Sequence, residues 1–198
     1  MQVLALTGGI ASGKSTACRL IQHLVPKCVL FDCDASVRGM LDTNAEVAAE
    51  VAAEFGSQVL TSSGQIDRSF LRQEVFASVE ARRRLESILH PRVRQECLAS
   101  REGAAKQGAE WFVADVPLLF EKGFDFGQTR VIVVASSRAT QMKRLKARDG
   151  FENSLIESIL QAQLPVDEKI ARADIVFWNE GPISVLEAQI RRFYHLSP

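Results

Sequence analysis

Short apolar runs alternate with helical patterns at both ends of the chain. Runs of four or five apolar residues predict buried strands, because strands covered on both faces lose the usual alternation of apolar and polar residues. They occur at 3–6, 28–31, 111–114, 131–135 and 175–178. Apolar residues at helical spacing predict helices at 14–25 and 182–194. Because strands and helices are interleaved, we predict an α/β fold, a three-layer sandwich around a five-stranded parallel sheet.

The pattern changes between residues 35 and 107, where helical spacing dominates and strand-like runs are rare. An Ala- and Glu-rich helix is expected at 45–55, and a second helix should begin after Asp67 as its N-cap. A long amphipathic helix or pair of helices is expected at 80–106, with a break at Pro91, since proline lacks the N–H that a helix interior needs. We interpret the whole stretch as a helical insertion in the α/β core.

The composition is that of an ordinary globular protein. Of the 198 residues, 46% are hydrophobic and 24% charged, and Lys plus Arg equal Asp plus Glu at 24 each, so the charge gives no sign of nucleic acid or membrane as a partner. Four cysteines without CxxC spacing and only three histidines argue against a zinc site or a disulfide framework. The N-terminus lacks a signal-peptide pattern, and no apolar run nears the about 20 residues of a membrane span. We expect a cytoplasmic protein, either a monomer or a weak homo-oligomer.

A phosphate-binding motif follows the first predicted strand. The pattern G-x-x-x-x-G-K-[ST] is matched in full by Gly8 through Ser15, between a strand and a helix as the motif requires. In such loops the backbone N–H groups cradle phosphate oxygens, and the following helix adds its positive N-terminal dipole. We predict that Lys14 reaches the β- and γ-phosphates and that the Ser15 hydroxyl holds Mg²⁺. The predicted ATP-binding loop comprises Gly9, Ile10, Ala11, Ser12, Gly13, Lys14, Ser15 and Thr16.

Acidic residues follow the second and third predicted strands, at the edge where a parallel sheet binds its ligands. Asp32 and Asp34 come directly after the strand at 28–31, and either could accept or orient the proton of an acceptor hydroxyl. Alternate residues of extended chain point to opposite sides, so one of the two could instead cap a helix. Asp115 ends the strand at 111–114, where it could bind Mg²⁺ or cap a helix.

Five basic residues gather within a charged helical stretch and just before it. They are Arg138, Lys143, Arg144, Lys146 and Arg148. Arg144 and Arg148 are four residues apart and share one helix face, where two guanidinium forks suit triphosphate oxygens. Small-molecule kinases that carry this phosphate-binding motif close a mobile lid, which brings arginines onto the transferring phosphoryl group and excludes water. A solvated basic helix face is the alternative, and the phosphate-binding motif favours the lid.

Together these residues resemble the dephospho-CoA kinase family, and the resemblance covers nearly the whole chain. The matching segments, in chain order, are Leu6 to Thr16, Asp32-Cys33-Asp34, Leu89-His90-Pro91, Asp115 to Glu121, Gln141 to Asp149, Gln163-Leu164-Pro165 with Lys169, Ala173-Asp174 and Asn179-Glu180-Gly181. The phosphate-binding motif alone indicates a nucleotide site, whereas these segments in this order indicate one family. The family usually has Ala at the position of Cys33 and often Arg at that of Ile159, which puts a third lid arginine in doubt.

The resemblance implies ATP-dependent phosphorylation of the 3′-hydroxyl on the ribose of dephospho-CoA, with Mg²⁺ as the cofactor. It also implies three parts of a P-loop NTPase fold. A nucleotide-binding core would comprise residues 1–34, 108–140 and 169–198, a helical acceptor domain residues 35–107, and a helical lid residues 141–168.

The resemblance also implies roles for single residues. Asp34 is expected to be the general base, Lys14 the phosphate clamp, and Arg144 with Arg148 the lid arginines. Asn179 is expected in the adenine pocket. The residues expected on the acceptor side are Thr7, Asp32, His90, Asp115, Leu118 and Glu121, and those expected to hold the metal are Ser15 and Asp115.

Two other functions are compatible with the phosphate-binding motif. A nucleoside monophosphate kinase or a shikimate kinase would carry the same motif, and the insertion between the second and third strands would select its acceptor. A GTPase switch or a non-catalytic ATP sensor would be a different class of protein. The guanine motif N-K-x-D is absent, since its nearest candidate is Asn179-Glu180-Gly181. A base, a lid and a phosphate loop together favour an enzyme.

Overall fold

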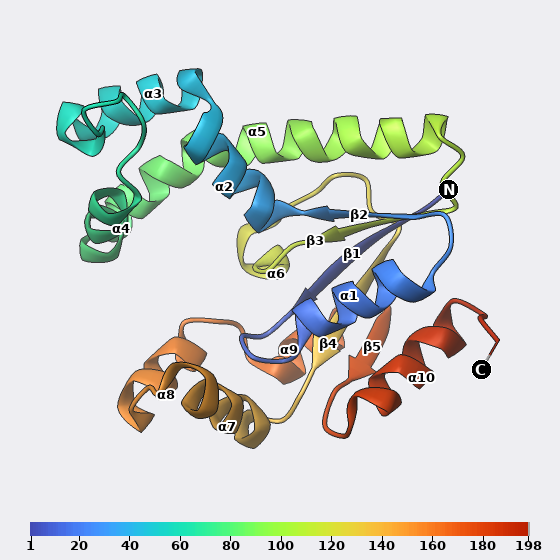
Figure 1. Cartoon of the computed structure of the whole chain (residues 1–198). Helices are drawn as coiled ribbons and strands as arrows, with labels where there is room; N and C mark the ends of the chain where they lie inside the picture. The colour runs from blue at the N-terminus through green and yellow to red at the C-terminus, as the bar shows by residue number, and fades with distance from the viewer. Residues whose placement is uncertain (198) are drawn as a thin grey trace. The chain divides into compact units, whose positions relative to one another are not determined.

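A parallel sheet forms the centre of the fold. The computed structural model describes residues 1–197 of the 198-residue chain. Within these residues, five strands form one sheet in the order β2-β3-β1-β4-β5 (Figure 1). Their bounds are β1 Gln2–Gly8, β2 Cys28–Asp32, β3 Trp111–Asp115, β4 Arg130–Ala135 and β5 Ile175–Trp178. β1 pairs in parallel with β3 and β4, and β4 with β5. The predicted five-stranded parallel sheet is confirmed.

Helices connect the strands and fill the stretch between β2 and β3. Their bounds are α1 Lys14–Leu24, α2 Cys33–Thr43, α3 Ala45–Phe55, α4 Arg68–Ala77, α5 Val79–Lys106, α6 Leu119–Lys122, α7 Arg138–Asp149, α8 Asn153–Gln161, α9 Val166–Ala171 and α10 Ile183–Phe193. The predicted N-cap of α4 is confirmed, since Asp67 accepts from the N–H groups of Ser69 and Phe70. Across residues 1–197, none of the helices has the length and apolar character needed to cross a membrane.

The core lies on both faces of the sheet. Alternate strand residues point to opposite faces, and Leu4 and Leu6 of β1 face a cluster that includes Ile21 of α1 and Ile190 of α10. Figure 1 shows α1 and α10 side by side, and their residues are in contact. α9 packs against β4, so helices cover the sheet as the predicted three-layer arrangement requires.

The chain divides into two compact units. Residues 1–31 and 100–198 form the first, called here the sheet unit, and residues 32–99 form the second, called the helical unit. The helical unit contains α2, α3, α4 and most of α5. The expected roles of residues 35–107 as an acceptor domain and of residues 141–168 as a lid stay predictions.

Helix α5 continues without interruption through Pro91, so the predicted break at His90-Pro91 is wrong. Proline removes one backbone N–H and crowds the carbonyl groups of the preceding turn. The N–H that is missing at residue 91 would have bonded to the Ser87 carbonyl oxygen, and the guanidinium of Arg92 donates to the next carbonyl oxygen, that of Ile88, at 2.8 Å. Arg92 also lies 2.6 Å from Glu50 of α3, which ties the helix to its neighbour at this point. These contacts favour the helix despite the proline.

Candidate active site

The phosphate-binding loop connects β1 to α1 in the sheet unit. Gly13, the N-cap of α1, has a φ of +98°, a left-handed conformation that L side chains rarely adopt. A Cβ atom at Gly13 would lie 1.9 Å from the side-chain nitrogen of Asn179. The Thr16 N–H bonds to the Gly13 carbonyl oxygen at 3.0 Å, so the helix begins directly after this residue. Glycine is therefore required both for the backbone path and for the close approach of Asn179.

Two glutamines hold the backbone of Ile10 from both sides. The side chain of Gln141, on α7, donates to the Ile10 carbonyl oxygen at 2.7 Å. The side-chain oxygen of Gln163, between α8 and α9, accepts from the Ile10 N–H at 2.9 Å. Gly9 must also be small, because a Cβ atom there would lie 2.6 Å from the Gln141 nitrogen. The first half of the loop is thus fixed by α7 and by the segment before α9.

Arg144 and Asn179 hold the next two carbonyl groups of the loop. Nη1 of Arg144 donates to the carbonyl oxygens of Ala11 and Ser12, both at 3.1 Å. Nη2 of Arg144 donates to the Asn179 carbonyl oxygen at 2.9 Å, and the Asn179 side chain donates to the Ser12 carbonyl oxygen at 2.8 Å. In a peptide the N–H points opposite to the C=O, so carbonyls held outward favour N–H groups that face inward, as an anion-binding nest requires.

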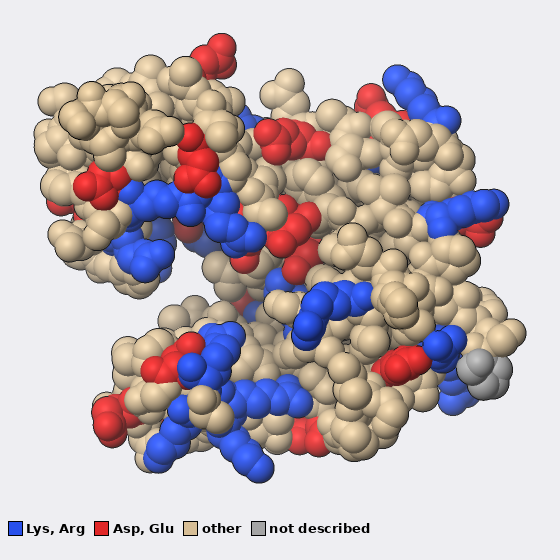
Figure 2. Space-filling view, in the orientation of Figure 1, with Lys and Arg blue, Asp and Glu red and all other residues tan. Residues whose placement is uncertain are grey.

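Two other arginines of α7, Arg138 and Arg148, form ion pairs at the surface. Arg148 is exposed and pairs with its neighbour Asp149 at 2.8 Å, and Arg138 pairs with Glu157 of α8. Figure 2 shows Lys and Arg side chains gathered over α7 and α8 at the lower left of the view. Arg144 alone among these three arginines contacts the phosphate-binding loop in the described residues. The lid role of Arg144 and Arg148 stays a prediction.

Lys14 forms an ion pair with Asp115 at the carboxyl end of β3. β3 pairs with β1 so that Asp115 lies opposite Leu6, which brings the carboxylate beside the loop that follows β1. The second oxygen of Asp115 accepts from the Cys18 thiol at 3.3 Å. Asp115 is only 7% exposed, and a buried carboxylate is stable only when its oxygens have donors. Its predicted metal-binding role stays a prediction.

Asp32 and Asp34 lie at the start of the helical unit. Oδ1 of Asp32 accepts from the Ala35 N–H at 2.8 Å, and Oδ2 lies 3.8 Å from Arg38. Of the roles left open for the two aspartates, capping of α2 therefore belongs to Asp32. Asp34 lies in the first turn of α2 and its side chain is exposed. Its role as general base, and the acceptor role of the half-buried His90 on α5, stay predictions.

Thr7 and Leu118 lie where β1 and β3 end in the sheet unit. Thr7 is buried, and its hydroxyl donates to the Pro117 carbonyl oxygen at 3.2 Å, which ties the end of β1 to the segment after β3. Leu118 is half-buried and is the N-cap residue of α6. Both residues are therefore at the ligand-binding edge of the sheet, and their contact with an acceptor stays a prediction.

The Glu121 carboxylate, on α6, contacts α9 and the segment before it. Its Oε1 lies 2.7 Å from Nζ of Lys169 and accepts from the Leu164 N–H at 3.1 Å. Burial acts to raise the pKa of Glu121, but the hydrogen bonds from Lys169 and from backbone N–H groups outweigh it. The pKa therefore lies below its ordinary value, and the side chain is ionised at neutral pH.

Glu180, directly after Asn179, closes the N-terminus of α7. Its Oε2 accepts from the Thr140 hydroxyl at 2.6 Å, and its Oε1 accepts from the Ser137 N–H. Carboxylates are stabilised at helix N-termini by the unpaired N–H groups there. The hydrogen bond from Thr140, followed by those from Ser137, lowers the pKa of Glu180 below its ordinary value of 4.5.

We expect Glu180→Gln to lower the melting temperature in a pH-dependent way. The folded pKa is below the unfolded one, so the carboxylate stabilises the fold fully above pH 4.5. This stabilisation is lost as the pH falls through the folded pKa. Thermal unfolding of wild type and variant should therefore differ most above pH 4.5 and converge below it. A difference of constant size from neutral to strongly acidic pH would contradict this expectation.

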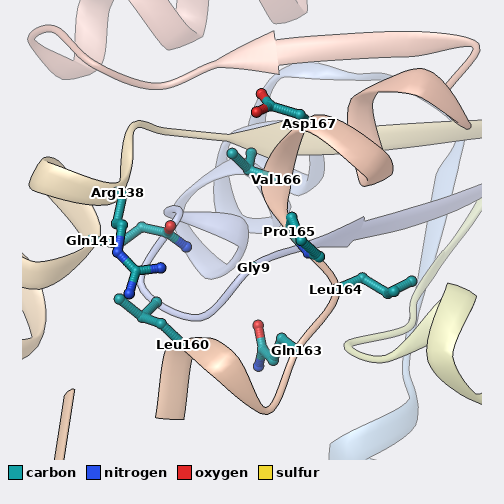
Figure 3. A pocket seen from close by; sticks show the side chains of 9 residues that line it. All are labelled: Gly9, Arg138, Gln141, Leu160, Gln163, Leu164, Pro165, Val166 and Asp167. Carbon is teal, nitrogen blue, oxygen red and sulfur yellow. The ribbon is translucent and has the colours of Figure 1, made fainter. Parts of the chain in front are cut away.

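A cavity of about 200 Å³ lies between the phosphate-binding loop and its supports (Figure 3). Its lining residues are Gly9, Arg138, Gln141, Leu160, Gln163, Leu164, Pro165, Val166 and Asp167. Pockets for drug-sized ligands measure about 300–1,000 Å³, so this cavity is smaller than a whole-nucleotide site. Two of its polar residues, Gln141 and Gln163, are those that hold Ile10. The cavity therefore belongs to the support of the loop.

Four residues of this site had no role assigned from the sequence. Gln141, Gln163 and Glu180 stand in segments that carry the family resemblance, but the local pattern does not reveal which distant backbone group each one contacts. Cys18 had no signal beyond its apolar neighbours, and its contact with Asp115 depends on the pairing of β1 with β3. The resemblance could have drawn attention to the first three.

Comparison with known proteins identifies the family. Residues 2–184 match the sequence profile of the dephospho-CoA kinase family. The chain belongs to this family. A dephospho-CoA kinase of Anaeromyxobacter dehalogenans is 43% identical to this kinase over 195 residues, 97% of this chain and 90% of that protein. A dephospho-CoA kinase of Bacillus cereus is 37% identical over 189 residues, 95% of this chain and 93% of that protein.

A solved structure agrees with the sequence comparison. The dephospho-CoA kinase from Campylobacter jejuni is similar to this kinase with a TM-score of 0.74 and 26% identity, over 98% of this chain and 96% of that chain. The family phosphorylates dephospho-CoA with ATP in coenzyme A biosynthesis, and the chain is a kinase of this kind. The resemblance seen in the sequence is confirmed. The other small-molecule kinases, the GTPase switch and the ATP sensor are set aside.

Proposed function

We propose that this kinase binds ATP at residues 8–16 and transfers its γ-phosphoryl group to the 3′-hydroxyl of the ribose of dephospho-CoA. Lys14 binds the β- and γ-phosphates, and Asp34 accepts the proton of the hydroxyl. Arg144 and Arg148, on the lid, contact the transferring phosphoryl group, and Asn179 lies beside the adenine. On the acceptor side the proposed contacts are Thr7, Asp32, His90, Asp115 and Leu118.

The main support for the proposal is the set of side-chain hydrogen bonds that fix the backbone of the phosphate-binding loop. Gln141, Arg144 and Asn179 donate to three consecutive loop carbonyls, those of residues 10 to 12. A nest whose dipoles are fixed before the ligand arrives needs no reorganisation on binding. Lys14 lies next to this nest, paired with Asp115. A bound phosphate would become a second partner of the Lys14 ammonium group, and it carries more negative charge than the Asp115 carboxylate.

The proposed step balances without a further reactant. The 3′-oxygen of the ribose forms a bond to the γ-phosphorus while the bond from this phosphorus to the bridging β–γ oxygen breaks. The hydroxyl proton passes to the Asp34 carboxylate, and ADP leaves with the electron pair of the broken bond. Asp34 then releases the proton to water, which its exposed position in α2 supports. One ATP and one dephospho-CoA thus yield ADP and CoA.

The residues at the loop fit a magnesium ion. Mg²⁺ prefers oxygen ligands and is usually held by one or two protein groups together with substrate phosphates and water. Ser15 is exposed in the first turn of α1, and the Asp115 carboxylate is bonded to the neighbouring Lys14. We assign the ion to these two oxygen donors. When bound, Mg²⁺ neutralises charge on the phosphates.

Turnover with ATP, Mg²⁺ and a panel of acceptors tests the proposal. We expect ADP release with dephospho-CoA and only background release with AMP or shikimate. CoA is the matched control, because its 3′-hydroxyl already carries a phosphate and leaves no group to react. Phosphorus NMR of the product should show the new phosphate on the 3′-oxygen. Turnover of AMP or shikimate without turnover of dephospho-CoA would contradict the proposal.

A further inference from the structure

A largely buried ion pair joins α6 to α9. Lys169 is 0% exposed, and its Nζ lies 2.7 Å from Oε1 of Glu121. Taking two charges out of water is costly, and apolar side chains of similar size often stabilise a fold as well or better. Oε2 of Glu121 is also buried, with no hydrogen-bond partner among the described residues. A contribution to stability alone therefore explains the Glu121–Lys169 pair poorly. The residues that contact the pair suggest a second role.

A short series of contacts leads from this pair to the phosphate-binding loop. Oε1 of Glu121 accepts from the Leu164 N–H at 3.1 Å. The preceding residue, Gln163, accepts from the Ile10 N–H at 2.9 Å. Figure 3 shows Gln163 and Leu164 on the segment that leads into α9, near Gly9 of the loop. Glu121 thus reaches the loop backbone through two adjacent residues of one segment.

The segment after β3 therefore contacts the loop at both ends. Asp115, at the end of β3, pairs with Lys14 at the end of the loop. Glu121, on the helix that follows, holds the residues that fix Ile10 at its beginning. Both acidic residues belong to the single stretch from Asp115 to α6. Their contacts therefore fix the position of this stretch relative to the loop.

We propose that Glu121 and Lys169 are positioning residues for nucleotide binding, which hold residues 163–165 so that Gln163 fixes the backbone at Ile10. The loop then keeps the shape that fits the phosphates. The inference rests on the proposed role of residues 8–16 as the phosphate site. In this role Glu121 acts through Gln163 and touches neither substrate, in place of the acceptor contact expected from the family resemblance.

Two variants separate the positioning role from a stabilising one. Glu121→Met/Lys169→Met removes both charges at nearly constant volume, together with the carboxylate oxygen that accepts from the Leu164 N–H. Because no buried charge is left unpaired, this variant should fold with a melting temperature close to wild type. Gln163→Ala keeps the ion pair intact and removes only the contact with Ile10. Combining the two variants tests whether they act on the same property.

A matched control comes from the same helix. Glu168→Gln on α9 removes an exposed pair with Arg172, whose charged atoms are 3.8 Å apart. Among the described residues, neither side chain forms a hydrogen bond or ion pair with the loop. For each variant we would measure the Kd of ADP by calorimetry, the melting temperature, and the hydrogen exchange of the Ile10 amide by NMR. The last two readouts do not depend on catalysis.

We expect the Glu121→Met/Lys169→Met variant to bind ADP roughly tenfold more weakly, within the range of couplings measured between contacting residues. Its Ile10 amide should exchange faster than in wild type. Gln163→Ala should weaken ADP binding to a similar extent, and the combined variant should be little worse than either, because all act through one contact. Glu168→Gln should match wild type in every measurement.

Three results would overturn the inference. One is wild-type ADP affinity in Gln163→Ala, a variant that should fold whatever happens to the ion pair. Another is wild-type Ile10 exchange in the double variant, and the third is full additivity of the two changes. Failure of the proposed phosphate site at residues 8–16 looks different, because wild-type protein would then bind neither ADP nor ATP.

Discussion

Replacing Asp34 with Asn is expected to lower kcat by about 10²–10⁴-fold while the Kd of ATP stays close to wild type. Asn keeps the shape of the side chain but does not accept the proton of the acceptor hydroxyl. The ATP site proposed for residues 8–16 lies in the sheet unit, whereas Asp34 begins the helical unit. Steady-state kinetics with dephospho-CoA and titration with an ATP analogue measure the two quantities separately.

Asp32→Asn is the matched control for this prediction. The amide oxygen can still accept from the Ala35 N–H, as Oδ1 of Asp32 does at 2.8 Å, so the N-cap of α2 survives the change. Because Asp32 is also a proposed acceptor contact, we expect this variant to raise the KM of dephospho-CoA while it keeps most of its kcat. A strong loss in Asp32→Asn beside normal turnover in Asp34→Asn would reverse the two roles. Equal rates for Asp34→Asn and wild type would remove Asp34 from the chemistry.

The strands could be predicted from the sequence because each is a continuous apolar run in a sheet covered on both faces. The run at 111–114 became β3, which the structure extends to Asp115, and the other four runs became strands in the same way. The order of the strands could not be predicted from these runs. It depends on which crossover connects which neighbours, and β3 lies between β2 and β1 although it follows both of them in the chain.

The parts of the candidate site that could be predicted are those formed by one continuous stretch of chain. The phosphate motif is such a stretch, and its glycines follow from the backbone path that phosphate binding needs. The contacts that hold the loop in place join residues far apart in the chain. Gln163 and Ile10, for example, are 153 positions apart. The helix break expected at Pro91 was wrong for a similar reason, since the Arg92–Glu50 pair, a contact between two helices, stabilises α5 where the local rule predicts a break.

Replacing Lys14 with Met is expected to lower kcat/KM for ATP by roughly 10²–10³-fold, the usual loss for one donor aimed at developing charge. Lys14 starts α1 directly after Gly13, so its ammonium group is the charged donor next to the braced loop. In its proposed role, its charge would act on the phosphates of both the ground state and the transition state. We therefore expect the Kd of ATP to rise and kcat to fall, and single-turnover kinetics can separate the two effects.

Loss of Lys14 has a second consequence that must be separated from the first. Among the described residues, Asp115, 7% exposed, would keep the Cys18 thiol as its one remaining side-chain partner, and breaking a buried ion pair costs about 3–5 kcal/mol. The single variant could thus lose activity through unfolding. Lys14→Met/Asp115→Asn removes the orphaned charge, so its melting temperature should recover. Its kcat/KM should stay below that of Asp115→Asn alone, which measures the loss of the proposed metal ligand. If kcat/KM recovered together with the melting temperature, Lys14 would act only through the stability of the pair.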